Sequence, residues 1–152
     1  EVYDTGRDLD FIMCPVGGGG LAAGTILSTK LFSSNTKVIL AEPLNASDAY
    51  ESFIKKTLIP VQSPNTIADG LKTSLSERTF NIILNGTNKI ITVTEDEIIS
   101  AMRLIWERLK IVCEPSCSVP LAALLKEPKE FKNKKVVIIL TGGNVDLKKL
   151  PF

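Results

Sequence analysis

The sequence predicts an α/β fold in which a parallel, twisted sheet is flanked by helices. Short apolar runs of strand length alternate along the chain with longer stretches that carry helical periodicity. The connections between these segments are short, which is typical of βαβ units with right-handed crossovers. Four consecutive glycines, residues 17–20, separate the first apolar run from the first helical stretch. At 152 residues, the chain has the length of about one domain.

The first βαβ unit occupies the start of the chain. The apolar run Phe11–Val16 predicts a strand, and Leu21–Leu31, rich in alanine and leucine, predicts the helix that follows it. Polar residues 33–35 end that helix, and Lys37–Ala41 predicts the second strand. Because the two strands are joined through a helix, we expect them to be parallel.

Two further helices and a third strand are predicted in the middle of the chain. Asn45–Lys56 predicts a helix capped by its first residue or by Ser47, whereas residues 60–65 have the composition of a loop. Glu77–Leu84 predicts the next helix, and Lys89–Val93 alternates in the manner of a strand.

The clearest helix begins at Thr94, which forms the capping-box pattern with Glu97. Apolar residues recur after it at helical spacing, with Ala101 and Trp106 beside them, and we interpret this stripe as core packing. Its members are Ile98, Met102, Ile105 and Leu109.

The chain closes with a short helix and a strand. Val119–Leu125 predicts the helix, and Val136–Leu140, which is apolar throughout, predicts a strand buried on both faces. Neither an internal repeat nor a shift in composition marks a second domain.

Composition excludes several classes of function. The chain carries 18 basic and 17 acidic residues, a formal net charge of +1, which argues against nucleic-acid binding. It contains no histidine, so Ser-His-Asp catalysis, Cys-His catalysis and imidazole-based zinc sites are excluded within this chain. The odd number of cysteines, without a signal peptide, predicts a reducing, cytoplasmic location. Because no apolar run approaches the ~20 residues of a membrane helix, no membrane partner is expected.

The glycine run between a strand and a helix points to an anion-binding loop. Glycine loses more backbone entropy on folding than any other residue, so a run of four is costly. Without Cβ atoms, the N–H groups of residues 17–20 can approach a ligand closely, and the helix N-terminus adds free donors and a positive dipole end. We therefore predict a phosphate site here; the alternative is a plain tight turn.

The same loop also fits a weaker pattern, the dinucleotide-binding fingerprint. Gly17, Gly19 and Ala22 match its glycine-rich turn. Glu42 ends the second strand roughly 20 residues further on, where a ribose-binding carboxylate would lie. A redox enzyme or a nucleotide-binding regulator is therefore an alternative hypothesis of a different class.

A set of short motifs spanning residues 15–146 carries a family resemblance. The motifs are Pro15–Leu21, Ala41–Asp48, Thr66–Lys72, Thr92–Ile98, Trp106–Arg108, Glu114–Ser116 and Thr141–Asp146. Taken in this order, they resemble the pyridoxal-phosphate (PLP) enzymes of the serine racemase and threonine dehydratase family, and most of all its eukaryotic serine racemases. The resemblance implies the large-domain part of the fold type II architecture, which is similar to the β subunit of tryptophan synthase.

The resemblance implies a PLP site. The phosphate would be bound by Gly17, Gly18, Gly19, Gly20 and the N–H of Leu21. Thr141 would place its hydroxyl at the pyridine nitrogen, where a neutral group need not keep that nitrogen protonated. Gly70 would lie against the ring, although the sequence alone favours a simple loop turn there, and Glu114 would help to set the electronics of the ring.

The resemblance also implies a divalent cation, held by Glu42, the carbonyl of Ala46 and Asp48. Two carboxylates and a carbonyl so close in sequence suit Mg²⁺ or Ca²⁺ in a structural role. The alternative is a surface turn with Asp48 in the first turn of a helix. Some members of the family bind ATP as an activator, for which Lys110 and Asn144 are the candidate positions.

The chain departs from the family pattern in two respects. Cys117 and Ser118 follow the Glu-Pro-Ser motif, where small residues are usual; Cys117 would narrow the site, respond to redox conditions or, as we favour, act as a buried small hydrophobe. The family's catalytic lysine lies in a Ser-x-Lys-x-Arg motif before the glycine loop, and no lysine here has that context. Residues 1–152 are therefore expected to be a C-terminal portion, mostly large domain, that is inactive without the N-terminal remainder.

The functional hypothesis concerns the whole enzyme. It would remove the α-proton of serine, and of threonine, and then either return a proton to the other face or eliminate the β-hydroxyl to give a keto acid and ammonia. A threonine dehydratase is the near alternative, and a non-catalytic fragment that binds only anions and metal is a third. Because relatives are usually dimers, we expect a homodimer in which this chain packs against its N-terminal remainder.

Overall fold

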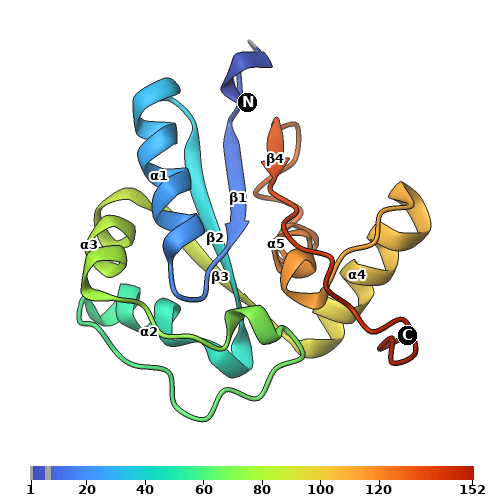
Figure 1. The fold of residues 1–152 in the computed structure, drawn as a ribbon. Coiled ribbons are helices and arrows are strands. Elements are labelled where there is room, and N and C mark those ends of the chain that lie inside the picture. The colour runs from blue at the N-terminus through green and yellow to red at the C-terminus, as the bar shows by residue number, and fades with distance from the viewer. Residues whose placement is uncertain (1, 6–7) are drawn as a thin grey trace.

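The computed structural model describes residues 2–5 and 8–152, which form a parallel sheet with helices on both faces (Figure 1). The strands are β1 (Phe11–Pro15), β2 (Lys37–Pro43), β3 (Lys89–Val93) and β4 (Val136–Ile138), in the spatial order β3-β2-β1-β4. The α-helices are α1 (Gly20–Phe32), α2 (Asp48–Lys55), α3 (Glu77–Gly86), α4 (Glu95–Leu109) and α5 (Pro115–Lys126). Short 3₁₀ helices are η1 (Tyr3–Thr5), η2 (Leu44–Ala46) and η3 (Asp69–Leu71). The predicted α/β class is confirmed.

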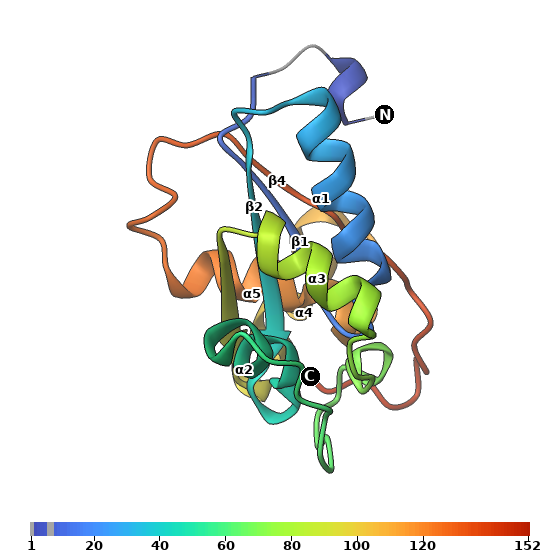
Figure 2. The same cartoon turned by 90° about the vertical axis from the view of Figure 1, so that its left-hand side faces the viewer.

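Both faces of the sheet are buried because successive strand residues point in opposite directions. From β1, Met13 belongs to the core shared with α4 and α5, whereas Ile12 and Cys14 belong to the core shared with α1 and α3. Figure 1 shows α1, α2 and α3 on one side of the sheet and α4 and α5 on the other, and Figure 2 looks onto the side covered by α1 and α3. Among the described residues, every helix is too short or too polar to cross a membrane.

The start of the second predicted helix needs correction. The helix expected from Asn45 begins instead at Asp48, after the turn η2. Ser47 occupies the N-cap position but makes no capping hydrogen bond with its side chain. Glu42, at the end of β2, accepts hydrogen bonds from two N–H groups of the first turn of α2, at 2.9 and 2.8 Å. The predicted cap was wrong because this capping group comes from a strand rather than from the helix's own start.

The last helix and strand also differ from their predictions. The helix expected at Val119–Leu125 is α5, which begins earlier, at Pro115, because proline is tolerated in a first turn where its missing N–H is not needed. The strand expected at Val136–Leu140 is shorter, and all five residues are half-buried rather than buried on both faces. Within the described part of the chain, β4 lies at the edge of the sheet and pairs only with β1.

The predicted core stripe of α4 is confirmed except at its end. Ile98, Met102 and Ile105 are at most 1% exposed. Leu109 is 55% exposed, because α4 ends there and the chain turns away through Lys110 in a left-handed conformation. Thr94 and Glu97 form the predicted capping box, with both reciprocal hydrogen bonds present.

Truncation of a buried strand residue should destabilise the fold far more than truncation of an exposed helix residue. Ile39, 1% exposed in β2, lies in the core between the sheet and the pair α4 and α5. We expect Ile39→Ala to lower the free energy of unfolding by about 2–5 kcal/mol. The control Leu31→Ala, on a side chain of α1 that is 74% exposed, should change it by less than about 0.5 kcal/mol. Urea unfolding measures both, and equal losses would contradict this placement of the core.

Candidate functional site

A pocket of about 240 Å³ lies at the carboxyl end of β1, beside the glycine loop. Its walls come from segments far apart in sequence: the β1–α1 loop, η3, the start of α5 and the segment that follows β4. Every residue that the resemblance assigned to the cofactor lies in this lining: Gly17, Gly18, Gly19, Gly20, Leu21, Gly70, Glu114 and Thr141. Open α/β sheets bind ligands at the carboxyl ends of their strands, so the pocket lies where the fold favours a site.

The glycine loop is packed tightly on its inner side and open at the start of α1. A Cβ at Gly17 would lie 2.9 Å from the Cα of Leu71, which leaves no room for a side chain. Gly19 has a left-handed φ of 83° at the N-cap of α1, and that cap makes no side-chain hydrogen bond. A Cβ at Gly20, in contrast, would have no heavy atom within 4 Å. Because no side chain caps α1, its first N–H groups are available to an anion.

Ser116 is a site residue that the sequence analysis missed. It lines the pocket, is 5% exposed, and its hydroxyl accepts a hydrogen bond from the N–H of Gly70 at 3.1 Å. A Cβ at Gly70 would lie 3.1 Å from that hydroxyl oxygen. Close packing against α5 therefore explains this glycine better than the simple loop turn that the sequence favoured. The signal was a buried serine inside the Glu-Pro-Ser motif, but its partner is 46 residues away.

Glu114 holds the segment after β4 against the start of α5. Its Oε2 accepts a hydrogen bond from the N–H of Asn144 at 2.8 Å, and its own N–H donates to the carbonyl of Gly142 at 3.3 Å. Gly142 has a left-handed φ of 86°, and a Cβ there would lie 2.5 Å from the Glu114 carboxylate. The two segments that bring Glu114 and Thr141 to the pocket are thus fixed to each other.

Cys117 lies behind the pocket and does not line it. It is 1% exposed and packs in a small core cluster with Met102, Ile105 and Cys113. The pKa of its thiol is raised, because the neighbouring Cys113 thiol and burial both favour the protonated form. This environment agrees with a buried small hydrophobe, the interpretation that the sequence favoured.

A second group of predicted residues lies at the end of β2 and the start of α2. Glu42, Ala46 and Asp48 are all buried, at 0%, 3% and 5% exposure. Burial raises the pKa of Glu42 to about 8, although the two α2 N–H groups that it accepts oppose this shift. Burial also raises the pKa of Asp48 to about 6, and both of its carboxylate oxygens are buried without a hydrogen-bond partner.

This group fits a hard divalent cation. An unpartnered buried carboxylate is costly unless a charge of opposite sign compensates it, and Asp48 has two such oxygens. The available donors are carboxylate and carbonyl oxygens, the ligands that Mg²⁺ and Ca²⁺ prefer. Among the described residues, no three His, Cys, Asp or Glu side chains form a metal-binding cluster, so water would have to complete the coordination.

The two positions suggested for ATP lie outside the pocket. Lys110 is an exposed residue at the C-cap of α4. Asn144 is exposed and is tied by its backbone to Glu114. The chain segments that carry them are close, because a Cβ at Gly143 would lie 2.8 Å from the carbonyl oxygen of Val112.

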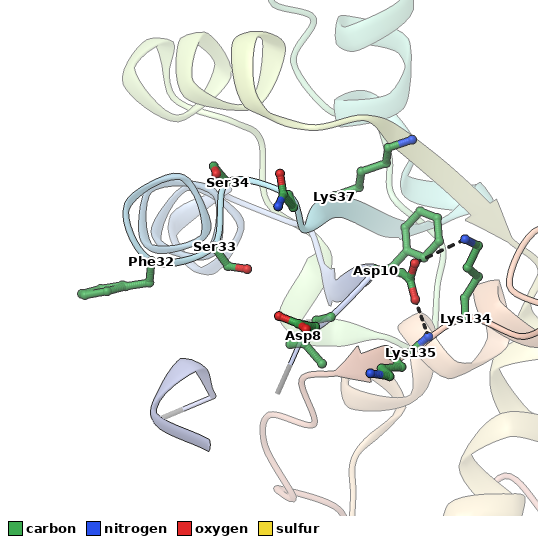
Figure 3. A pocket seen from close by; sticks show the side chains of 11 residues that line it. Asp8, Asp10, Phe32, Ser33, Ser34, Lys37, Lys134 and Lys135 are labelled. Atoms are coloured by element: carbon green, nitrogen blue, oxygen red, sulfur yellow. Dashed lines mark hydrogen bonds and ion pairs between the residues drawn. The ribbon is translucent and has the colours of Figure 1, made fainter. Parts of the chain in front are cut away.

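A larger cavity, about 680 Å³, lies at the opposite, amino-terminal edge of the sheet (Figure 3). None of the predicted site residues lines it. Its Asp10 carboxylate accepts hydrogen bonds from the N–H of Lys135 at 2.8 Å and from Nζ of Lys134 at 3.3 Å, as Figure 3 shows. The Lys135 N–H is the main reason that the pKa of Asp10 is lowered. Asp10 and Lys134 therefore pair with each other rather than converging on a ligand.

Comparison with known proteins places the chain in a family. The model of the family described as "Pyridoxal-phosphate dependent enzyme" matches residues 1–142. The chain is 47% identical over its full length to β-hydroxyaspartate dehydratase of Paracoccus denitrificans, of which it covers 48%. It is 49% identical over 97% of its length to serine racemase of Dictyostelium discoideum, of which it covers 47%. The chain thus spans about half the length of the curated relatives it matches.

Solved structures agree with the sequence relatives. The crystal structure of serine racemase from Dictyostelium discoideum matches with a TM-score of 0.88 at 49% identity, covering 96% of this chain and 47% of that one. The maize serine racemase matches with a TM-score of 0.91 at 36% identity, covering 96% and 46%, and a bacterial-type threonine deaminase matches with a TM-score of 0.89 at 38% identity, covering 95% and 53%. The chain therefore belongs to the family of pyridoxal-phosphate-dependent enzymes and has the α/β architecture of the fold type II members.

Proposed function

We propose that the protein containing this chain uses PLP to racemise serine or to eliminate water from small β-hydroxy amino acids. The convergence of all the expected cofactor residues in one pocket carries the proposal. Relatives support the chemistry: besides the dehydratase and the racemase above, L-threo-3-hydroxyaspartate ammonia-lyase of Saccharomyces cerevisiae is 38% identical. Threonine dehydratase remains the near alternative, given the likeness to threonine deaminase. The family match leaves the dinucleotide alternative without support.

Within this proposal, the chain binds and orients the cofactor. The N–H groups of residues 17–20 and of Leu21, at the uncapped start of α1, bind the phosphate. Thr141 presents its hydroxyl to the pyridine nitrogen, and the bare Cα of Gly70 leaves space for the ring. Glu114, fixed by the N–H of Asn144, keeps its carboxylate at the pocket wall. When bound, PLP supplies an electron-accepting ring that stabilises negative charge on the substrate's α-carbon.

The groups that move the α-proton are assigned to the N-terminal remainder of the protein. No lysine within residues 2–5 and 8–152 lines the pocket, and the catalytic lysine implied by the resemblance belongs to a motif that this chain does not carry. The chain alone is therefore proposed to be inactive. ATP activation through Lys110 and Asn144, a homodimer and a cytoplasmic location remain predictions.

We also propose that Glu42, the carbonyl of Ala46 and Asp48 hold Mg²⁺ or Ca²⁺. The unpartnered oxygens of Asp48 support this. The cation would join the end of β2 to the start of α2, so its role would be structural rather than chemical.

A carboxylate placed at the start of α1 should abolish cofactor binding without unfolding the protein. Gly20 is the first residue of α1, and a Cβ there has open space. We expect Gly20→Asp to weaken PLP binding at least about 100-fold, because the new charge would repel the phosphate and occupy its place. The melting temperature should not fall, since an acidic residue in a first helical turn is favourable. Absorbance titration with PLP and thermal melting measure the two effects.

The matched control for this substitution is Gly24→Asp, one turn further along α1. A Cβ at Gly24 also has open space, but Gly24 does not line the pocket. Its PLP affinity should stay within about twofold of the unmodified protein, because a surface charge one turn away is screened by water. Full PLP binding by Gly20→Asp would rule out the glycine loop as the phosphate site.

The metal proposal predicts effects of opposite sign with and without the cation. Without metal, Asp48→Asn removes an unpartnered buried charge, so its melting temperature should be equal to or above that of the unmodified protein. With Mg²⁺ or Ca²⁺, the unmodified protein should melt several degrees higher and the variant should not respond. The control Glu77→Gln, an acidic residue in the first turn of α3, should keep the response. A variant that still responds to metal would exclude Asp48 as a ligand.

Activity should be tested on the complete protein supplied with PLP. We expect keto acid and ammonia from serine, threonine or 3-hydroxyaspartate, or the D-isomer from L-serine, when each is supplied separately. A coupled dehydrogenase assay measures the keto acid, and chiral chromatography measures the D-isomer. PLP binding without turnover of any of these substrates would contradict the proposed substrate class while leaving the cofactor site intact.

A further inference from the structure

The back of the glycine loop rests on the first turn of α3. The hydroxyl oxygen of Thr79 lies 3.1 Å from the carbonyl oxygen of Gly18. A Cβ at Gly19 would lie 2.7 Å from Cβ of Thr79 and 2.8 Å from Cδ2 of Leu75, so these residues touch the loop backbone. Thr79 does not line the pocket. It therefore supports the loop from behind, on the side away from any ligand.

The proton of the Thr79 hydroxyl is directed to the glycine loop. This hydroxyl accepts a hydrogen bond from the N–H of Ser76 at 3.0 Å, as part of the capping box of α3. Its single proton has two carbonyl acceptors at 3.1 Å, those of Gly18 and Ser76. The carbonyl of Ser76 already accepts the N–H of Phe80 at 2.8 Å. Because that oxygen is paired within α3, the Gly18 carbonyl gains more from the Thr79 proton.

This hydrogen bond fixes the orientation of one peptide group in the loop. In a trans peptide, the carbonyl and the following N–H point in opposite directions. When Thr79 holds the Gly18 carbonyl toward α3, the N–H of Gly19 must point away from α3. Glycine next to glycine otherwise rotates freely, since neither residue has a Cβ to restrict it.

We propose that Thr79 is a positioning residue for the cofactor phosphate: its hydroxyl holds the Gly18–Gly19 peptide with the N–H turned toward the ligand side. The inference rests on the proposed function, because it takes the glycine loop as the phosphate site. Thr79 acts through the loop backbone and touches neither substrate nor cofactor. The sequence does not indicate this role, because Thr79 appears there only as a residue in the first turn of a predicted helix.

The test compares three variants of the complete protein. Thr79→Val keeps the shape of the side chain but removes the hydroxyl, and Thr79→Ser restores the hydroxyl. Ser76→Ala removes the side chain that accepts the N–H of Thr79, and so weakens the same capping box while leaving the bond to Gly18 in place. Three measurements are made on each: the Kd for PLP, the Kd for pyridoxal, which lacks the phosphate, and the ³¹P chemical shift of bound PLP.

We expect Thr79→Val to raise the Kd for PLP about five- to tenfold, because one neutral hydrogen bond is lost and the loop amide is freed. Its Kd for pyridoxal should stay unchanged, and its ³¹P shift should move. Thr79→Ser and Ser76→Ala should keep the PLP affinity to within about twofold. Ser76→Ala should nevertheless lower the melting temperature, since it loses a helix cap.

Two results would overturn the inference. If Thr79→Val weakens PLP and pyridoxal equally, or leaves the ³¹P shift in place, the hydroxyl does not act on the phosphate. If Ser76→Ala weakens PLP as much as Thr79→Val does, the effect comes from helix stability rather than from the bond to Gly18. Failure of the unmodified protein to bind PLP would instead contradict the proposed function, and the positioning role with it.

Discussion

Close contact between backbone segments at the carboxyl edge of the sheet is the constraint on which the site depends. The β1–α1 loop touches η3 at Gly17, and η3 touches α5 where Gly70 meets Ser116. A side chain at either glycine would push neighbouring segments apart and change the pocket between them. The same contacts place the free N–H groups of α1 opposite Thr141 and Glu114, so the pocket has an anion-binding end and a polar wall.

The buried carboxylates at the end of β2 follow a different logic. Glu42 takes the place of a side-chain cap for α2, and this use of a strand residue buries its charge completely. Asp48 adds a second buried carboxylate beside it, and its charge contributes to the raised pKa of Glu42. Two acidic groups in this position are stable together only if one is protonated or a cation lies between them. The fold therefore places a cation-dependent joint one strand away from the proposed phosphate loop.

The division of the site explains why relatives with different activities are equally similar to this chain. It is 47% identical to a dehydratase and 49% identical to a racemase over nearly the same residues. The residues described here surround the expected cofactor and do not include a group placed to move the α-proton. Binding of PLP is common to racemisation and elimination, whereas the choice between them depends on the proton donor and the groups around the β-hydroxyl.

The sequence by itself determined the α/β class, the order of strands and helices, and the cofactor residues, because apolar periodicity and the glycine motifs are local signals. It failed for the cap of α2, for the half-buried β4 and for the exposed Leu109, because burial and capping depend on neighbours distant in sequence. Only the tertiary structure decided the roles of Ser116 and Thr79. Their partners lie 46 and 61 residues away, and a hydroxyl has no function until folding brings its acceptor or donor within hydrogen-bond distance.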